Sequence, residues 1–178
     1  TVKYLQDNGS KVVLCSHLGR PNGEVVKEMS LRPISTLLAN MLNRHIDEVY
    51  DCMSIEAMTA VRKLGPGEVI LLENIRFHRG EEENDPKFAS KLAGFADIFV
   101  NDAFGAAHRA HASTVGVASY LPSVAGLLME RELTMLGNVL GHVERPFAAV
   151  FGGAKVSDKM GILQRLAPEL DALIVGGG

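Results

Sequence analysis

The sequence has few cysteines, no long apolar run and little net charge, and each shortage excludes a class of protein. Its two cysteines, Cys15 and Cys52, do not have the spacing of a metal or redox motif. We expect both to be buried or half-buried free thiols in a reducing compartment. No stretch approaches the roughly 18 apolar residues of a membrane-spanning helix. A net charge of −3 argues against nucleic acid or an anionic membrane as a partner.

The composition is typical of a globular protein with a sizeable core. Apolar residues make up 47% of the chain and charged residues 22%. A length of 178 residues suits one domain, or one domain and part of a second. The sequence shows no internal repeat. Because it starts with Thr1 rather than methionine, it does not reveal whether a targeting peptide precedes it.

Short apolar runs alternate with amphipathic stretches along the chain. The runs predict strands over residues 11–16, 69–72, 98–100, 147–151 and 172–175. Apolar residues at helical spacing predict helices over residues 33–44, 54–64, 86–96, 124–140 and 157–166, the first three capped by Ser30, Ser54 and Asp85. Strands without a polar face indicate an α/β fold, in which a parallel sheet carries helices on both faces in a Rossmann-like three-layer arrangement.

The long helix over 124–140 suggests a division of the chain. We interpret residues 1–123 as a first lobe, residues 124–145 as an interdomain helix and linker, and residues 146–178 as the first βαβ unit of a second, similar lobe. The alternative is that this helix is one more helix of a single domain.

Three predicted strands are followed by loops rich in cations. The loops His17–Pro21, Glu73–Gly80 and Asn101–His111 leave the carboxyl ends of their strands, which is the edge where open α/β sheets bind ligands. They carry four arginines and four histidines: Arg20, Arg76, Arg79, Arg109, His17, His78, His108 and His111. Guanidinium groups bind phosphate and carboxylate oxygens in pairs. Together the loops predict a site for a small phosphorylated or carboxylated metabolite.

Other interpretations of these loops are weaker. His108 and His111 could bind zinc, but no third ligand follows at a useful spacing. The acidic run Glu81–Glu83 is expected to be solvated or to neighbour the arginines, without a catalytic role.

A second group of residues surrounds the glycine pair Gly152-Gly153. A predicted strand leads into this pair, and the helix that follows starts with Lys155 and Lys159 on one face. Two cations are unfavourable at the positive end of a helix dipole, and a bound anion would offset their repulsion. This suggests that the segment binds nucleotide phosphates. The segment is neither a Walker A loop nor a G-x-G-x-x-G motif.

These stretches together resemble the phosphoglycerate kinase family. The resemblance lies in SHLGRPNG (16–23), in LLENIRFHRGEEENDPKFASKLAGFADIFVNDAFGAAHRAHAS (71–113), and in FGGAKVSDKMGILQRL with DALIVGGG (151–178). It implies a two-lobed enzyme that moves a phosphoryl group between 1,3-bisphosphoglycerate and ADP, giving 3-phosphoglycerate and ATP with Mg²⁺. It also implies a cytoplasmic monomer that acts on small molecules and binds neither nucleic acid nor membrane.

The resemblance also implies roles for particular residues. The 3-phosphoglycerate would be held by His17, Leu18, Gly19, Arg20, Arg76, Arg109 and His111. The nucleotide would lie against Gly153, Ala154, Lys155, Lys159 and Gly177. Lys155, Arg20 and Arg109 would be catalytic, with Lys155 steadying the transferred phosphoryl group. Further substrate residues are expected ahead of Thr1, and most nucleotide and Mg²⁺ ligands beyond Gly178.

Two functional interpretations follow from the sequence. In the first, the chain is part of a working kinase, and these 178 residues are inactive alone. In the second, it is a non-catalytic α/β domain that binds a phosphorylated metabolite. A nucleotide-binding lobe in a longer sequence would distinguish them.

Overall fold

Strand β3 (Val69–Leu72) lies at the centre of a three-stranded parallel sheet, between β1 (Val12–Leu14) and β2 (Asp47–Val49). The computed structural model describes residues 1–141, 143–153 and 160–176. All four residues of β3 are buried, as a continuous apolar run predicts. The strands expected over 11–16 and 69–72 are thereby confirmed, whereas the short, acidic β2 was not predicted.

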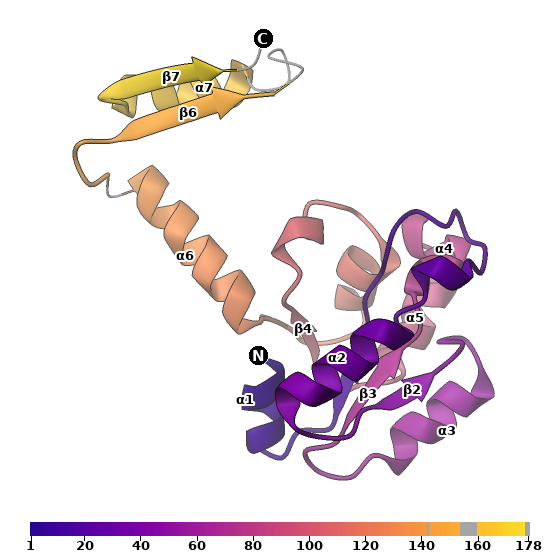
Figure 1. The fold of residues 1–178 in the computed structure, drawn as a ribbon. Helices are drawn as coiled ribbons and strands as arrows, with labels where there is room; N and C mark the ends of the chain where they lie inside the picture. The colour runs from indigo at the N-terminus through magenta and orange to yellow at the C-terminus, as the bar shows by residue number, and fades with distance from the viewer. Residues whose placement is uncertain (142, 154–159, 177–178) are drawn as a thin grey trace. The chain divides into compact units, whose positions relative to one another are not determined.

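Both faces of this sheet are covered by helices (Figure 1). Ile70 and Leu72 pack in one core with α3 (Ile55–Lys63) and α5 (Pro86–Ala93). Val69 and Leu71 pack in the other core with α1 (Val2–Asp7) and α2 (Arg32–Leu42). Successive strand residues face opposite sides, so this alternation builds the predicted three layers. Helix α1 was not predicted.

A second parallel sheet follows in the same part of the chain. It pairs β4 (Phe99–Asn101) with β5 (Ser123–Ala125). Within the described residues, the predicted strand over 98–100 therefore lies in a different sheet from the strands over 11–16 and 69–72. The loop between them holds a 3-10 turn, η3 (Phe104–Ala106), and a π-helical turn, η4 (Ala112–Gly116).

The helix expected over 124–140 is α6, which spans Leu127–Gly141. Its predicted start was wrong, because Val124 pairs with Val100 in the β4–β5 sheet. The helix begins where Asp102 accepts hydrogen bonds from the backbone N–H groups of Leu128 and Met129, at 2.8 and 3.2 Å.

Two of the three predicted helix caps are confirmed. Ser54 accepts a hydrogen bond from the Ala57 N–H, and Asp85 accepts one from Phe88. The Ser30 cap was wrong, since the N-cap of α2 is Leu31. The Ser30 hydroxyl, one residue earlier, still accepts the Arg32 N–H at the start of α2, at 3.3 Å. It also donates to Glu73 at 2.6 Å, and the same carboxylate accepts the Leu31 N–H.

Both cysteines are free thiols. Cys52 is buried in the core shared with α3 and α5, as expected. Cys15 is exposed, which corrects the prediction, because it follows the last residue of β1, where the chain leaves the sheet.

The chain divides into two units, Thr1–Glu130 and Arg131–Gly178. The second contains β6 (Ala148–Gly152) paired in parallel with β7 (Ala172–Gly176), and between them α7 (Met160–Leu166) and the 3-10 turn η6 (Ala167–Glu169). This is the predicted βαβ unit, although the first three residues of its expected helix lie outside the described ranges. No helix in the described ranges has the length and apolarity that crossing a membrane requires.

Candidate anion-binding site

The loops after β1 and β3 are joined by hydrogen bonds. The Arg76 guanidinium, in the 3-10 turn η2 (Ile75–Phe77), donates to the Gly19 carbonyl at 2.9 Å. The Asn74 amide donates to the Leu18 carbonyl at 2.8 Å and to the carbonyl of Met29, the last residue of the turn η1 (Lys27–Met29), at 2.9 Å. Asn74 is buried, and sequence reasoning gave it no role. The sequence feature that could have indicated this role is its position as a polar residue two places after a fully buried strand.

The loop after β4 is anchored to the same region by Glu81. This residue lies on α4 (Arg79–Glu82), a short helix that was not predicted, and only 1% of it is exposed. Its carboxylate accepts the Ser113 N–H at 2.9 Å and the Ser113 hydroxyl at 2.7 Å, and it lies 3.4 Å from His111 Nδ1. The prediction of a solvated acidic run was therefore wrong for Glu81. Glu82 does neighbour an arginine, since it pairs with Arg76 at 3.6 Å.

The electrostatics of His17 show which cations come together. Burial lowers the pKa of His17 below its usual 6.5, and the positive charges of Arg76, His111 and Arg109 lower it further. The effect of Glu82 is opposite and smaller. His17 therefore lies within electrostatic reach of cations from both of the other loops. Three other residues expected to bind an anion thus act electrostatically on His17.

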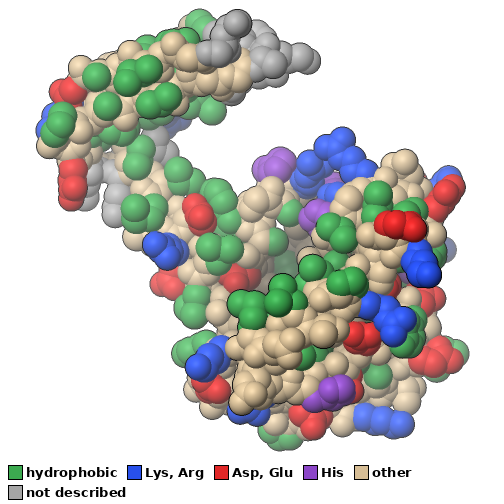
Figure 2. All heavy atoms as spheres, in the orientation of Figure 1, with side chains coloured by type: hydrophobic (Ala, Val, Ile, Leu, Met, Phe, Trp, Pro, Cys, Tyr) green, Lys and Arg blue, Asp and Glu red, His purple; other side chains and the backbone are tan. Residues whose placement is uncertain are grey.

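Three arginines of the cation-rich loops are not paired within the part of the protein that the structure describes. Within the described ranges, the side chains of Arg20, Arg79 and Arg109 have no hydrogen-bond or ion-pair partner. Arg109 is half-buried, so its charge is only partly solvated. Figure 2 shows Lys, Arg and His side chains close together at the upper edge of the first unit. Unpaired guanidinium groups beside a second cationic loop are suited to an anionic ligand.

Two of the candidate residues are already engaged within the protein. Arg76 is 5% exposed and holds Gly19 and Glu82, so it shapes the site as well as adding charge. His111 caps η4 and faces Glu81. Gly19 has a φ of +67°, and a Cβ there would lie 2.7 Å from Met29 Sδ, so a side chain at this position would be strained.

Two histidines of these loops do not join the cluster. His78 Nε2 instead lies 2.9 Å from Asp51. His108 is exposed, and the described residues provide no metal-ligand group that contains His108 or His111.

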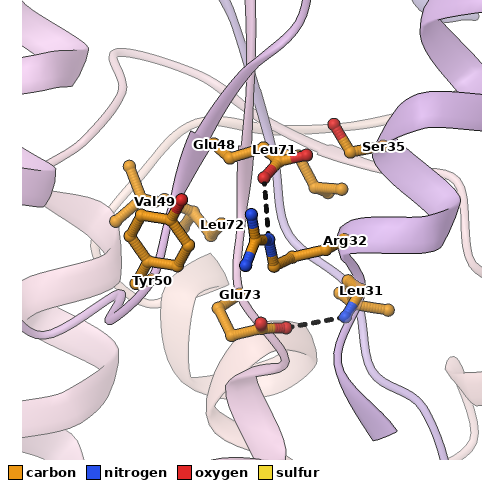
Figure 3. A pocket seen from close by; sticks show the side chains of 9 residues that line it. All are labelled: Leu31, Arg32, Ser35, Glu48, Val49, Tyr50, Leu71, Leu72 and Glu73. Atoms are coloured by element: carbon orange, nitrogen blue, oxygen red, sulfur yellow. Dashed lines mark hydrogen bonds and ion pairs between the residues drawn. The ribbon is translucent and has the colours of Figure 1, made fainter. Parts of the chain in front are cut away.

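A small hollow lies elsewhere on the first unit, between α2 and the ends of β2 and β3 (Figure 3). Its one cation, Arg32, is bonded to Glu48 at 3.3 Å and stacks on the Tyr50 ring at 5.0 Å. Because its charges are already paired, this hollow is a poor anion site.

A sequence model of the family described as "Phosphoglycerate kinase" matches residues 1–178 of this chain. The chain belongs to the phosphoglycerate kinase family. It is 54% identical over all 178 residues to the phosphoglycerate kinases of Moorella thermoacetica and Desulforudis audaxviator, and spans 45% of each.

Solved phosphoglycerate kinases have the same fold over this length. The enzyme from Coxiella burnetii matches with a TM-score of 0.84 and 41% identity, covering 99% of this chain and 44% of its own. The enzyme from Pyrococcus horikoshii matches with a TM-score of 0.85 and 32% identity, covering 99% and 45%. The chain thus spans less than half the length of the phosphoglycerate kinases that it matches.

The nucleotide residues suggested by the phosphoglycerate kinase motifs are only partly visible. Gly153 follows β6 with a φ of +133°, and Gly152 pairs with Gly176 at the carboxyl ends of β6 and β7. The remaining candidates lie outside the described residues: Ala154, Lys155, Lys159 and Gly177.

Proposed function

We propose that the protein to which this chain belongs transfers a phosphoryl group between 1,3-bisphosphoglycerate and ADP, forming 3-phosphoglycerate and ATP. The family membership supports the reaction class. The observation that carries the substrate assignment is the cluster around His17, in which Arg109 has no partner among the described residues. A ligand with both a phosphate and a carboxylate would neutralise such a cluster.

In this proposal the first unit holds the glycerate ligand. Arg20 and Arg109 bind its oxygens directly and stabilise negative charge during transfer, because fixed cations act where charge develops. Arg76 and His111 add positive potential and hold the loops in place, and His17 lies between them. Leu18 and Gly19 form the turn that carries Arg20.

The second unit is proposed to hold the nucleotide, at the glycine-lined ends of β6 and β7. Gly152 and Gly176 are paired there, and glycines permit a phosphate to approach the backbone closely. We assign Lys155 to the phosphoryl group in transit, and Gly153, Ala154, Lys159 and Gly177 to the nucleotide. Mg²⁺ would neutralise the nucleotide phosphates. Mg²⁺ in proteins is usually held by carboxylates, and the glycines at this edge have none, so other residues would have to bind it.

We keep the lobe boundaries 1–123, 124–145 and 146–178, and the cytoplasmic, monomeric state of the intact protein, as parts of this proposal. We also infer that these 178 residues do not turn over alone, since they span 45% of the relatives' length. The alternative is a non-catalytic domain that binds phosphorylated metabolites.

The direct test uses the full-length protein that contains this chain. We expect it to form ATP from 1,3-bisphosphoglycerate and ADP. We expect Arg109→Ala to weaken 3-phosphoglycerate binding by about 2–3 kcal/mol, because it removes a charge-assisted contact. The exposed Arg44→Ala is the matched control. Ligand binding without ATP formation would favour the non-catalytic alternative, and unchanged affinity in Arg109→Ala would remove Arg109 from the site.

A further inference from the structure

His78 was expected among the anion-binding cations, but the structure places it in a different group. Its Nε2 atom lies 2.9 Å from Asp51 Oδ1. Asp51 is in the loop after β2, and His78 directly precedes α4. Cys52 lies beside them, and one ligand atom from each of Asp51, Cys52 and His78 falls within 4.8 Å of the others. Within the described ranges, this is the one group of three potential metal ligands.

The three residues offer a carboxylate oxygen, a thiol sulfur and an imidazole nitrogen. Thiolate and imidazole ligands select transition metals, whereas Ca²⁺ and Mg²⁺ require sets of oxygen ligands. In a tetrahedral zinc site the metal lies about 2.0–2.3 Å from each ligand atom, so the ligand atoms lie about 3.3–3.8 Å apart. Asp51 and His78 are closer than this, at 2.9 Å, so their hydrogen bond would open by a few tenths of an ångström as a metal enters between them. The Cys52 sulfur would need only a small inward movement, because the three ligand atoms lie within 4.8 Å of one another.

Burial also fits a metal site better than a reactive thiol. Only 1% of Cys52 is exposed, so a substrate cannot reach its sulfur as it would a catalytic nucleophile. Asp51 is about half exposed, and His78 is one-third exposed. A metal held by these three residues would keep one coordination position open to water.

The ligands are positioned by groups around them. Asp51 Oδ1 also accepts the Met53 N–H at 2.7 Å, and the His78 ring lies 5.6 Å from the Phe88 ring. The Lys91 ammonium bonds to the Met53 carbonyl next to the cluster, and its charge opposes a metal ion.

We propose that Asp51, Cys52 and His78 bind a divalent transition metal of the Zn²⁺ class, with water as the fourth ligand. The site is separate from the anion-binding cluster and does not depend on the proposed function. On binding, the Cys52 thiol loses its proton to solvent and its sulfur forms a bond to the metal, while His78 binds as neutral imidazole. The metal would tie the loop after β2 to the start of α4.

The test is a titration of the 178-residue chain with Co²⁺, followed by absorption spectroscopy. Co²⁺ bound to a thiolate gives a charge-transfer band in the near ultraviolet, which an Asp51–His78 ion pair alone cannot produce. We expect this band to appear in the unaltered chain and to disappear when Zn²⁺ is added. We expect Cys52→Ser to lose the band, and His78→Gln and Asp51→Asn to weaken Co²⁺ binding at least about tenfold.

Cys15→Ser is the matched control, because it removes the other cysteine and should keep the band. Circular dichroism melts without metal establish that each variant is folded. Because Cys52 is buried and its variant can fail to fold, the more exposed Asp51 and His78 variants provide the independent test. The proposal is overturned by absence of the band in the unaltered chain, by its persistence in a folded Cys52→Ser, or by undiminished Co²⁺ binding in both folded Asp51 and His78 variants.

Discussion

His17 is the residue that reports most directly on the charge of the proposed site. Burial and three neighbouring cations lower its pKa, so the folded state resists its protonation. Stability from this effect is present above the unfolded value of about 6.5 and is lost as pH falls through the folded pKa. An anion bound among the cations would reverse much of their effect. We therefore predict that 3-phosphoglycerate raises the pKa of His17.

Proton NMR of the histidine rings measures this shift, and the spectrum of His17→Asn identifies the resonance. His45 is the control, because it is exposed and bonded to Asp47 at 3.0 Å. Its ring resonances should not move when the ligand is added. The proposed anion site would be contradicted if the pKa of His17 were not lowered in the absence of ligand, or if it did not rise when 3-phosphoglycerate was added.

Glu81 makes a different prediction, about stability. Its buried carboxylate accepts two hydrogen bonds from Ser113 and faces His111. Glu81→Ala leaves those donors without their acceptor, and we expect it to lower the free energy of unfolding by about 2–4 kcal/mol. Urea unfolding measures the change. The exposed Glu83→Ala should cost no more than about 0.5 kcal/mol, and equal losses in the two variants would show that Glu81 is not an anchor.

At the scale of elements, the start of α6 depends on Asp102. Although its partial burial would raise the pKa of Asp102, hydrogen bonds from Thr1 and from the Met129 and Leu128 N–H groups hold it below its usual range. A carboxyl group with a lowered pKa stabilises the fold above about pH 4, and this stabilisation is lost as pH falls through the folded pKa.

We therefore expect Asp102→Ala to cost about 1–2 kcal/mol at neutral pH, as for loss of a helix cap. The difference from the unaltered chain should shrink below about pH 4. Urea unfolding at both pH values checks this, with the exposed Asp97→Ala as control. A difference that does not change with pH would mean that the Asp102 charge contributes nothing.

Elements marked by an apolar run or by apolar residues at helical spacing could be predicted from the sequence, and elements without such a pattern could not. The buried run Val69–Leu72 is a strand as expected, and Ser54 and Asp85 cap their helices. Strand β2 has three residues, two of them acidic, and its pairing with β3 comes from the tertiary fold rather than from an apolar pattern. The β5 strand was hidden because Val124 also fits the apolar pattern of the following helix.

For the candidate site, the sequence indicated the right loops but not the partners within them. Clustering of Arg76, Arg109, His111 and His17 follows from strand order and charge. Glu81 is buried, and His78 pairs with Asp51. Both facts depend on the direction in which the turns after β3 point these side chains. No periodicity in a short turn carries that information.

At the scale of the whole molecule, the chain contains two units but less than half the length of the phosphoglycerate kinases that it matches. We expect the 178-residue chain to form no ATP from 1,3-bisphosphoglycerate and ADP in a coupled assay, while the longer protein does. ATP formation by the short chain, at a rate unaffected by removing contaminating kinase, would show that these residues are sufficient for turnover.

A thermal melt of the 178-residue chain with and without 3-phosphoglycerate shows whether the first unit binds this ligand. Ligand at ten times its dissociation constant should add about 1.4 kcal/mol to the folded state. We expect a cooperative melt that moves to higher temperature with 3-phosphoglycerate, and that moves much less in Arg109→Ala. A cooperative melt that 3-phosphoglycerate leaves unchanged would contradict this expectation.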